Sequence, residues 1–212
     1  MTPRPRRRGG GAARVRWRVA GEALNPAVVA LSVASGRLAF GSAAQGRRAP
    51  EGGRVSVEGR DVERGAVYEA EDRLARWFAL GRVRAFGSPW VLETQARFGS
   101  VPEVQRYVDA VLGHLGVQRP VTIRERRGAT RAHYEPDGVI ALPPERIGGQ
   151  WALQEVVVLH ELAHHLAPGQ LHGAGFRAAM LRLLGARGHD VAAHLLSIAY
   201  VEAGLAPVKG GL

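Results

Sequence analysis

Three residues stand at a spacing that is typical of zinc enzymes. His160, Glu161 and His164 form an H-E-x-x-H motif. Residues four apart lie on one face of an α-helix, so both imidazoles can bind a single zinc ion. Glu161 is placed to accept a proton from a zinc-activated water and to act as general base. The motif therefore predicts a metallohydrolase site in which Glu161 is the catalytic residue.

A third ligand is expected, because catalytic zinc sites usually combine three protein ligands with one open position. His172 lies just beyond a Pro-Gly turn and can fold back onto the motif. His165 points about 100° around the helix from His164 and is expected beside the site or at the surface. The predicted zinc ligands are thus His160, His164 and His172.

The elements that position these residues follow from hydrophobic periodicity. Apolar residues at helical spacing predict helices over 66–80, 103–115, 150–167 and 190–203, with a further run from 172 to 184. Alternation predicts strands over 86–92, 121–124, 132–135 and 139–142, the last two joined by a Pro-Asp-Gly turn. This order predicts an α+β fold with a small, mainly antiparallel sheet.

Five other residues that could take part in chemistry receive no role from the sequence. We expect His189 and His194 to be surface or helix-capping residues. Tyr200, Tyr134 and His133 could donate hydrogen bonds to an oxyanion, but ordinary packing is the simpler expectation for all three.

The motif resembles those of known metallopeptidases. H-E-L-A-H followed by a short turn and H-G-x-G-F, from His160 to Phe176, is similar to the SprT-like and related minimal zincins, whose third ligand is a His that opens the next helix. The segments 67–72 (V-Y-E-A-E-D) and 104–112 (V-Q-R-Y-V-D-A-V-L) resemble a family of small actinobacterial proteins assigned as metallohydrolases. The resemblance covers about residues 66–205. It implies a minimal zincin domain whose edge strand, expected at Val139–Pro143, pairs with extended substrate backbone.

Some alternatives stay open at this point. A metzincin would carry a third His at position 170, which is Gln170 here, and a gluzincin would use a downstream acid, either Asp190 or Glu202. A regulatory protease of the ImmA/IrrE kind would also need an acidic third ligand. From another class, a nucleic-acid-binding module could carry a structural or vestigial zinc site. The leading expectation is a zinc metallopeptidase that hydrolyses amide bonds of a peptide or protein.

The first 65 residues differ in composition from the remainder. They hold 13 Arg and 5 acids, a net charge of +8, whereas residues 66–212 hold 16 basic and 14 acidic residues, a net charge of +2. This Arg-, Gly- and Ala-rich segment predicts a disordered extension ahead of a metallohydrolase domain at 66–212. Such a basic arm could bind nucleic acid. However, 28 of the 29 basic residues are Arg, which suggests a GC-rich genome as much as a nucleic-acid partner.

The absence of cysteine limits the available chemistry. With no Cys, the chain has neither disulfides nor thiolate zinc ligands, and only His and carboxylates remain as ligands for a metal. The apolar stretches are too short and too broken for a membrane anchor, so we expect a cytoplasmic protein without membrane contact.

Overall fold

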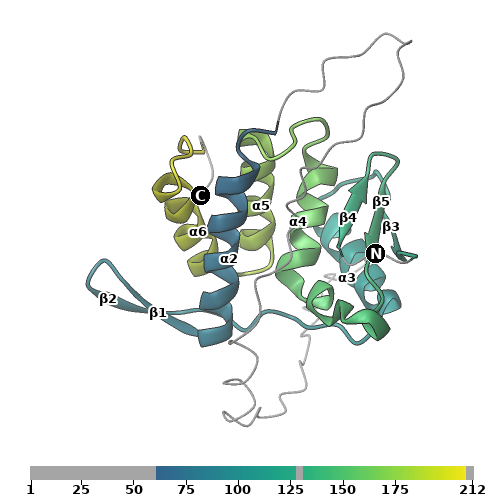
Figure 1. Cartoon of the computed structure of the whole chain (residues 1–212), viewed down its shortest axis with the longest axis horizontal. Coiled ribbons are helices and arrows are strands. Elements are labelled where there is room, and N and C mark those ends of the chain that lie inside the picture. Colours follow the sequence, from purple (N-terminus) through teal and green to yellow (C-terminus); the bar gives the residue numbers. More distant parts are fainter. Residues whose placement is uncertain (1–60, 128–130, 209–212) are drawn as a thin grey trace, which may run out of the picture. The chain divides into compact units, whose positions relative to one another are not determined.

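A buried helix carries the H-E-x-x-H motif. Helix α4 spans Glu155–Leu166, and residues 155–163 are all buried. It begins after Gln154, whose backbone is extended, and the preceding η2 (Gly149–Leu153) is a 3-10 helix. The predicted helix start at residue 150 is therefore five residues too early. Figure 1 shows α4 between helix α5 (Ala174–Ala186) and strand β4 (His133–Glu135).

The computed structural model describes residues 61–127 and 131–208, all within one compact unit. The remaining helices are α2 (Arg64–Leu80), α3 (Val101–His114), α6 (Asp190–Glu202) and the 3-10 turn η1 (Glu145–Ile147). The remaining strands are β1 (Arg82–Ala85), β2 (Ser88–Val91), β3 (Thr122–Glu125) and β5 (Val139–Leu142). The predicted α+β class is confirmed.

The three-stranded sheet is mixed rather than mainly antiparallel. Its order is β3-β5-β4, in which β4 and β5 form the predicted antiparallel hairpin and β3 runs parallel to β5. The prediction of Val139–Pro143 as the edge strand was wrong, because β5 is paired on both sides. Ile140, Ala141 and Leu142 are fully buried, as expected of a central strand. In the described residues, β4 is the edge strand beside α4.

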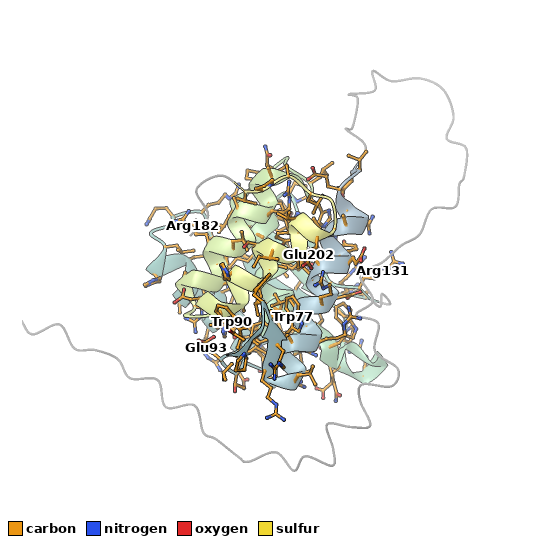
Figure 2. All side chains as sticks on the ribbon, turned by 90° about the vertical axis from the view of Figure 1, so that its left-hand side faces the viewer. Trp77, Trp90, Glu93, Arg131, Arg182 and Glu202 are labelled. Atoms are coloured by element: carbon orange, nitrogen blue, oxygen red, sulfur yellow. The ribbon has the colours of Figure 1, made fainter. Side chains whose placement is uncertain are left out.

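A second sheet is a hairpin where the sequence predicted one strand. β1 and β2 pair antiparallel, and Phe86 and Gly87 form the turn with φ angles of 53° and 76°. Positive φ at both positions fits a two-residue hairpin, but phenylalanine is rare there and gave no turn signal. Trp90 of β2 packs on His194 of α6, with ring centroids 5.9 Å apart, on the side that Figure 2 faces.

Helix α6 packs against both α2 and α5, α5 also packs against α4, and the four helices share one apolar core. From α2 this core takes Val67, Ala70 and Leu74, all fully buried. Within residues 61–127 and 131–208, no helix has both the length and the apolar composition needed to cross a membrane.

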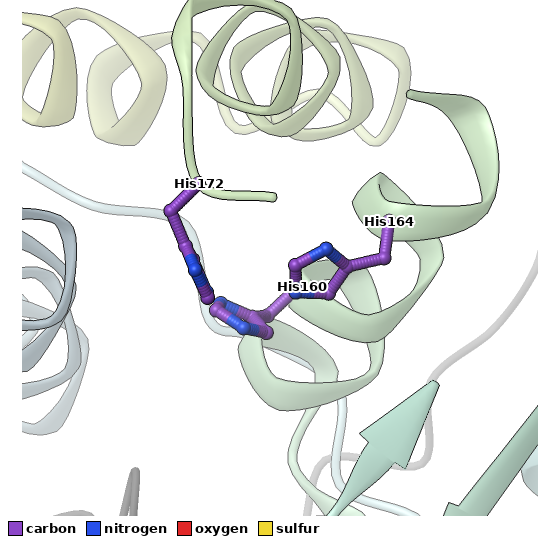
Figure 3. Close-up of side chains that lie close together, drawn as sticks. All are labelled: His160, His164 and His172. Atoms are coloured by element: carbon purple, nitrogen blue, oxygen red, sulfur yellow. The ribbon is translucent and has the colours of Figure 1, made fainter. Parts of the chain in front are cut away.

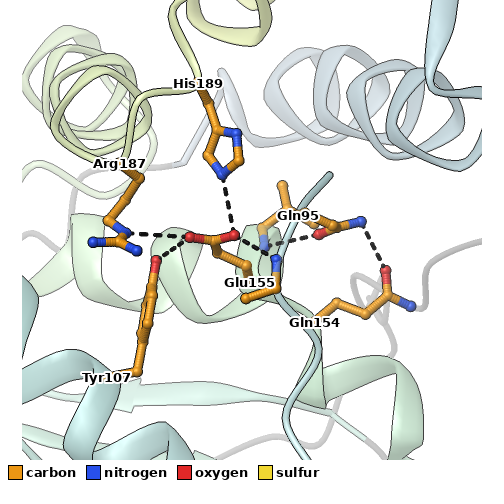
Figure 4. Close-up of polar contacts among 8 residues, drawn as sticks. Gln95, Tyr107, Gln154, Glu155, Arg187 and His189 are labelled. Carbon is orange, nitrogen blue, oxygen red and sulfur yellow. Dashed lines mark hydrogen bonds and ion pairs between the residues drawn. The ribbon is translucent and has the colours of Figure 1, made fainter. Parts of the chain in front are cut away.

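A buried polar cluster fixes the beginning of α4 (Figure 4). The Glu155 carboxylate accepts hydrogen bonds from the Tyr107 hydroxyl (2.5 Å) and the Ala96 backbone N–H (2.6 Å), and it pairs with His189 (3.1 Å) and Arg187 (3.3 Å). His189, expected at the surface or as a helix cap, does stand at the N-cap position of α6, but its side chain is buried on Glu155 and does not cap the helix. Burial raises the pKa of Glu155, but the hydrogen bonds outweigh burial and hold it at about 2.

Candidate metal centre

The three predicted histidines lie together. Nitrogen atoms of His160, His164 and His172 are all within 4.8 Å of one another (Figure 3). The first two project from successive turns of α4, and the third comes from the loop before α5. His160 and His172 are buried, whereas His164 is partly exposed. This group could hold a metal ion.

The loop between α4 and α5 turns back sharply to bring His172 to the site. Gly169 and Leu171 both have positive φ, 75° and 47°, and the N–H of Gly173 bonds to the carbonyl of Gln170 at 2.8 Å. A Cβ at Gly175 would come within 2.8 Å of the Gln170 side chain. The glycines of H-G-x-G are thus explained by this tight return of the chain.

Two of the three imidazoles are anchored by carboxylates. Glu71 of α2 lies 2.6 Å from Nδ1 of His160, and Asp61 lies 2.6 Å from Nδ1 of His172. The second oxygen of Glu71 accepts a hydrogen bond from the Tyr200 hydroxyl at 3.0 Å. A carboxylate on Nδ1 fixes the ring orientation and makes the opposite nitrogen, Nε2, a better metal donor.

The buried Nε2 of His172 is an observation that points to a ligand. It is shielded from solvent and has no hydrogen-bond partner. A buried polar atom without a partner costs free energy, and native structures rarely leave one unsatisfied. A metal ion between the three imidazoles would satisfy this atom. Nitrogen donors of this kind suit zinc.

The protonation of the imidazoles also bears on metal binding, which requires a neutral ring nitrogen. Burial and the neighbouring imidazoles lower the pKa of His164 to about 2. Burial also lowers the pKa of His172, against the opposing effect of Asp61. Burial lowers the pKa of His160 too, but the Glu71 and Glu161 carboxylates together raise it by more. Two of the three rings are therefore neutral at neutral pH.

Glu161 lies at the site but is not a member of the histidine group. It is only 5% exposed, and burial raises its pKa against the lowering effects of His160 and the Tyr134 backbone. A carboxylate with a raised pKa is better suited to accept and return a proton near neutrality. This agrees with the role of general base that the motif predicts for it.

Aromatic rings surround the three imidazoles. The Phe176 ring, fully buried, has its centroid 4.5–4.9 Å from each of them. Tyr68 of α2 lies on His172 and His160 at 5.0 and 5.6 Å, and Tyr134 of β4 stacks on His164 at 6.4 Å. Both tyrosines are partly exposed. The site thus has a closed apolar wall at Phe176.

The acidic candidates for the third ligand lie elsewhere. Asp190 is exposed at the beginning of α6. Glu202, labelled in Figure 2, is also exposed and pairs with Arg73 at 2.6 Å. His165 is fully buried rather than at the surface, and its ring contacts Arg119 and the hydroxyl of Tyr134, which itself stacks on His164, so His165 lies beside the site as expected. Among the predicted candidates, only His172 joins the motif histidines.

Sequence reasoning missed the residues in α2, and just before it, that support the site. Arg64, Tyr68 and Glu71 are spaced by four and three residues, so they fall on one face of α2, and Asp61 lies three residues before the helix begins. That polar stripe was the available signal. The contacts of Asp61 with His172 and of Arg64 with Tyr68 show that residues 61–65 belong with the folded unit, although the sequence placed them in a disordered extension. The rest of that extension, residues 1–60, lies outside the described residues.

Comparison with known proteins adds no relative. No family model, curated protein or solved structure matches the chain.

Proposed function

We propose that this protein is a zinc metallohydrolase, and specifically a metallopeptidase that hydrolyses amide bonds of a peptide or protein substrate. The observation that carries the proposal is the unsatisfied Nε2 of buried His172, which lies beside the two motif histidines. Glu161, which follows His160 in the motif, is buried as well. His160, His164 and His172 would hold the zinc. When bound, zinc supplies a Lewis acid that polarises a carbonyl and acidifies a water.

The residues of the chain divide the remaining chemistry. Glu161 takes a proton from the attacking water while the oxygen of that water bonds to the carbonyl carbon. The same carboxyl then delivers this proton to the amide nitrogen as the C–N bond breaks, so the products are an amine and a carboxylic acid, which loses its remaining proton to solvent or to the amine at neutral pH. Glu71 and Asp61 hold two imidazoles in place, while Phe176 keeps water from the inner side of the site.

Substrate backbone would bind along β4. This strand packs beside α4 and, within the described residues, pairs with β5 on one side only. An extended peptide could add to the open edge by main-chain hydrogen bonds. The proposed substrate-binding edge is therefore β4 (His133–Glu135), in place of the predicted strand 139–143.

The two other functions considered from sequence receive less support. A regulatory protease with an acidic third ligand would need Asp190 or Glu202 at the histidine group, and neither lies there. A nucleic-acid-binding role would depend on the Arg-rich segment, and residues 1–60 lie outside the described part of the chain. No observation on the described residues favours either one.

The test is cleavage of a peptide library by the zinc-loaded protein, with and without a chelator. We expect cleavage that stops on chelation and returns when zinc is added. Activity that survives both chelation and the Glu161→Gln substitution would overturn the proposal.

A further inference from the structure

Tyr68 is an aromatic residue at the metal centre that the proposed mechanism does not use. Its ring meets His172 edge-on at 80°, with centroids 5.0 Å apart, and lies 5.6 Å from His160. Phe176 contacts the same imidazoles but is fully buried, whereas Tyr68 is partly exposed. The imidazoles are thus bordered by a closed hydrocarbon wall and by an accessible ring that carries a hydroxyl.

Helix α2 fixes the position of this hydroxyl. The guanidinium carbon of Arg64, one turn earlier, lies 5.2 Å from the centroid of the Tyr68 ring, and its side chain hydrogen-bonds to the hydroxyl. A guanidinium has donors only, so the hydroxyl oxygen accepts this bond and directs its own hydrogen to another acceptor. Glu71 holds the same helix to His160.

The Tyr68 ring lies against the imidazoles of His160 and His172, and the charges of Glu161 and Glu71 both act on its hydroxyl. A substrate carbonyl attacked by a water that Glu161 activates would lie at the three histidines, and the Tyr68 ring borders two of them. The carbonyl oxygen gains negative charge during the attack, and a hydrogen-bond donor placed there in advance lowers the barrier.

On the basis of the proposed function, we propose that Tyr68 is a further catalytic residue, whose hydroxyl donates a hydrogen bond to the substrate oxygen as that oxygen becomes negative. The bond forms without proton transfer, since the proton of the water goes to Glu161 and then to the leaving amine. When the C–N bond breaks, the oxygen becomes part of the product carboxylate. Arg64 is a positioning residue, because it acts through the hydroxyl of Tyr68.

The test uses the full-length, zinc-loaded protein and phenylphosphonate, a tetrahedral oxyanion that resembles the charged intermediate. By calorimetry, we expect Tyr68→Phe to bind phenylphosphonate about 10- to 100-fold more weakly than the wild type, as for loss of a hydrogen bond to a charged group. Zinc affinity should be unchanged. Tyr107→Phe is the matched control, since its hydroxyl contacts Glu155 in the other cluster, and it should bind the probe as the wild type does.

Equal phenylphosphonate affinity in Tyr68→Phe and the wild type would overturn the role of Tyr68. A zinc-loaded wild type that does not bind phenylphosphonate would overturn it too, yet would leave the metal site standing. A chain that binds no zinc would instead overturn the proposed function. With a peptide substrate, Tyr68→Phe should lower kcat with little change in KM, and an effect on KM alone would contradict a catalytic role.

Discussion

Replacing Glu71 with Gln should weaken zinc binding without changing any zinc ligand. Glu71 is 1% exposed and uses both oxygens, one on Nδ1 of His160 and one on the Tyr200 hydroxyl. A glutamine has only one acceptor oxygen, so it can no longer accept from both partners, and the negative charge beside His160 is removed. Loss of such a partner typically lowers metal affinity by about 10- to 100-fold.

This loss of affinity converts into a measurable loss of stability. In zinc excess over both dissociation constants, a 10- to 100-fold weaker affinity removes about 1.4 to 2.7 kcal/mol of zinc-dependent stabilisation. At about 2–4 °C per kcal/mol for a domain of this size, the zinc-induced rise in Tm should be about 3–11 °C smaller in Glu71→Gln.

The assay combines chelator competition, which gives the zinc dissociation constant, with thermal unfolding at fixed zinc concentration. Glu69→Gln is the matched control, because it makes the same substitution two residues earlier on α2 at an exposed position. The control should behave as the wild type does. Equal zinc affinity in Glu71→Gln and Glu69→Gln would refute the argument that Glu71 orients His160.

Three further predictions concern the base, the chain start and acid stability. Glu161→Gln should keep its zinc yet lower peptide hydrolysis by about 10²- to 10⁴-fold, measured as cleavage rate and metal content. A chain that begins at residue 66 should bind zinc more weakly than one that begins at residue 61, because it lacks Asp61 on His172; equal affinity would contradict this. The pKa of Glu155, about 2 when folded and about 4.3 when unfolded, predicts that its carboxylate stabilises the fold above about pH 4.3 and less as the pH falls towards 2. The difference in Tm between wild type and Glu155→Gln should therefore shrink on acidification, and a constant difference would argue against it.

Hydrophobic periodicity located most elements because it reports on burial along one face. The predicted helix 66–80 is α2, which begins two residues earlier, and the predicted helix 190–203 is α6, which ends one residue earlier. The residues of β5 were predicted as a strand, but its central place in the sheet could not be predicted in this way. Its apolar residues fit an edge or a central strand alike, and the parallel pairing with β3 depends on how the chain crosses over.

The residues of the candidate site also fall into those that the sequence could locate and those that it could not. His160, Glu161 and His164 could be located because their spacing is local, and His172 because it follows a short turn. The carboxylates on these histidines could not, since Glu71 is 89 residues from His160 and Asp61 is 111 residues from His172. Only the tertiary packing of α2 against the site brings these partners together.

The most direct test of the metal centre is a crystal structure of the zinc-loaded protein, with data collected on both sides of the zinc absorption edge. We expect one zinc ion held by the Nε2 atoms of His160, His164 and His172, with the Nδ1 atoms of His160 and His172 still on Glu71 and Asp61. A zinc ion bound through Asp190 or Glu202, or no zinc at the three histidines, would contradict the account.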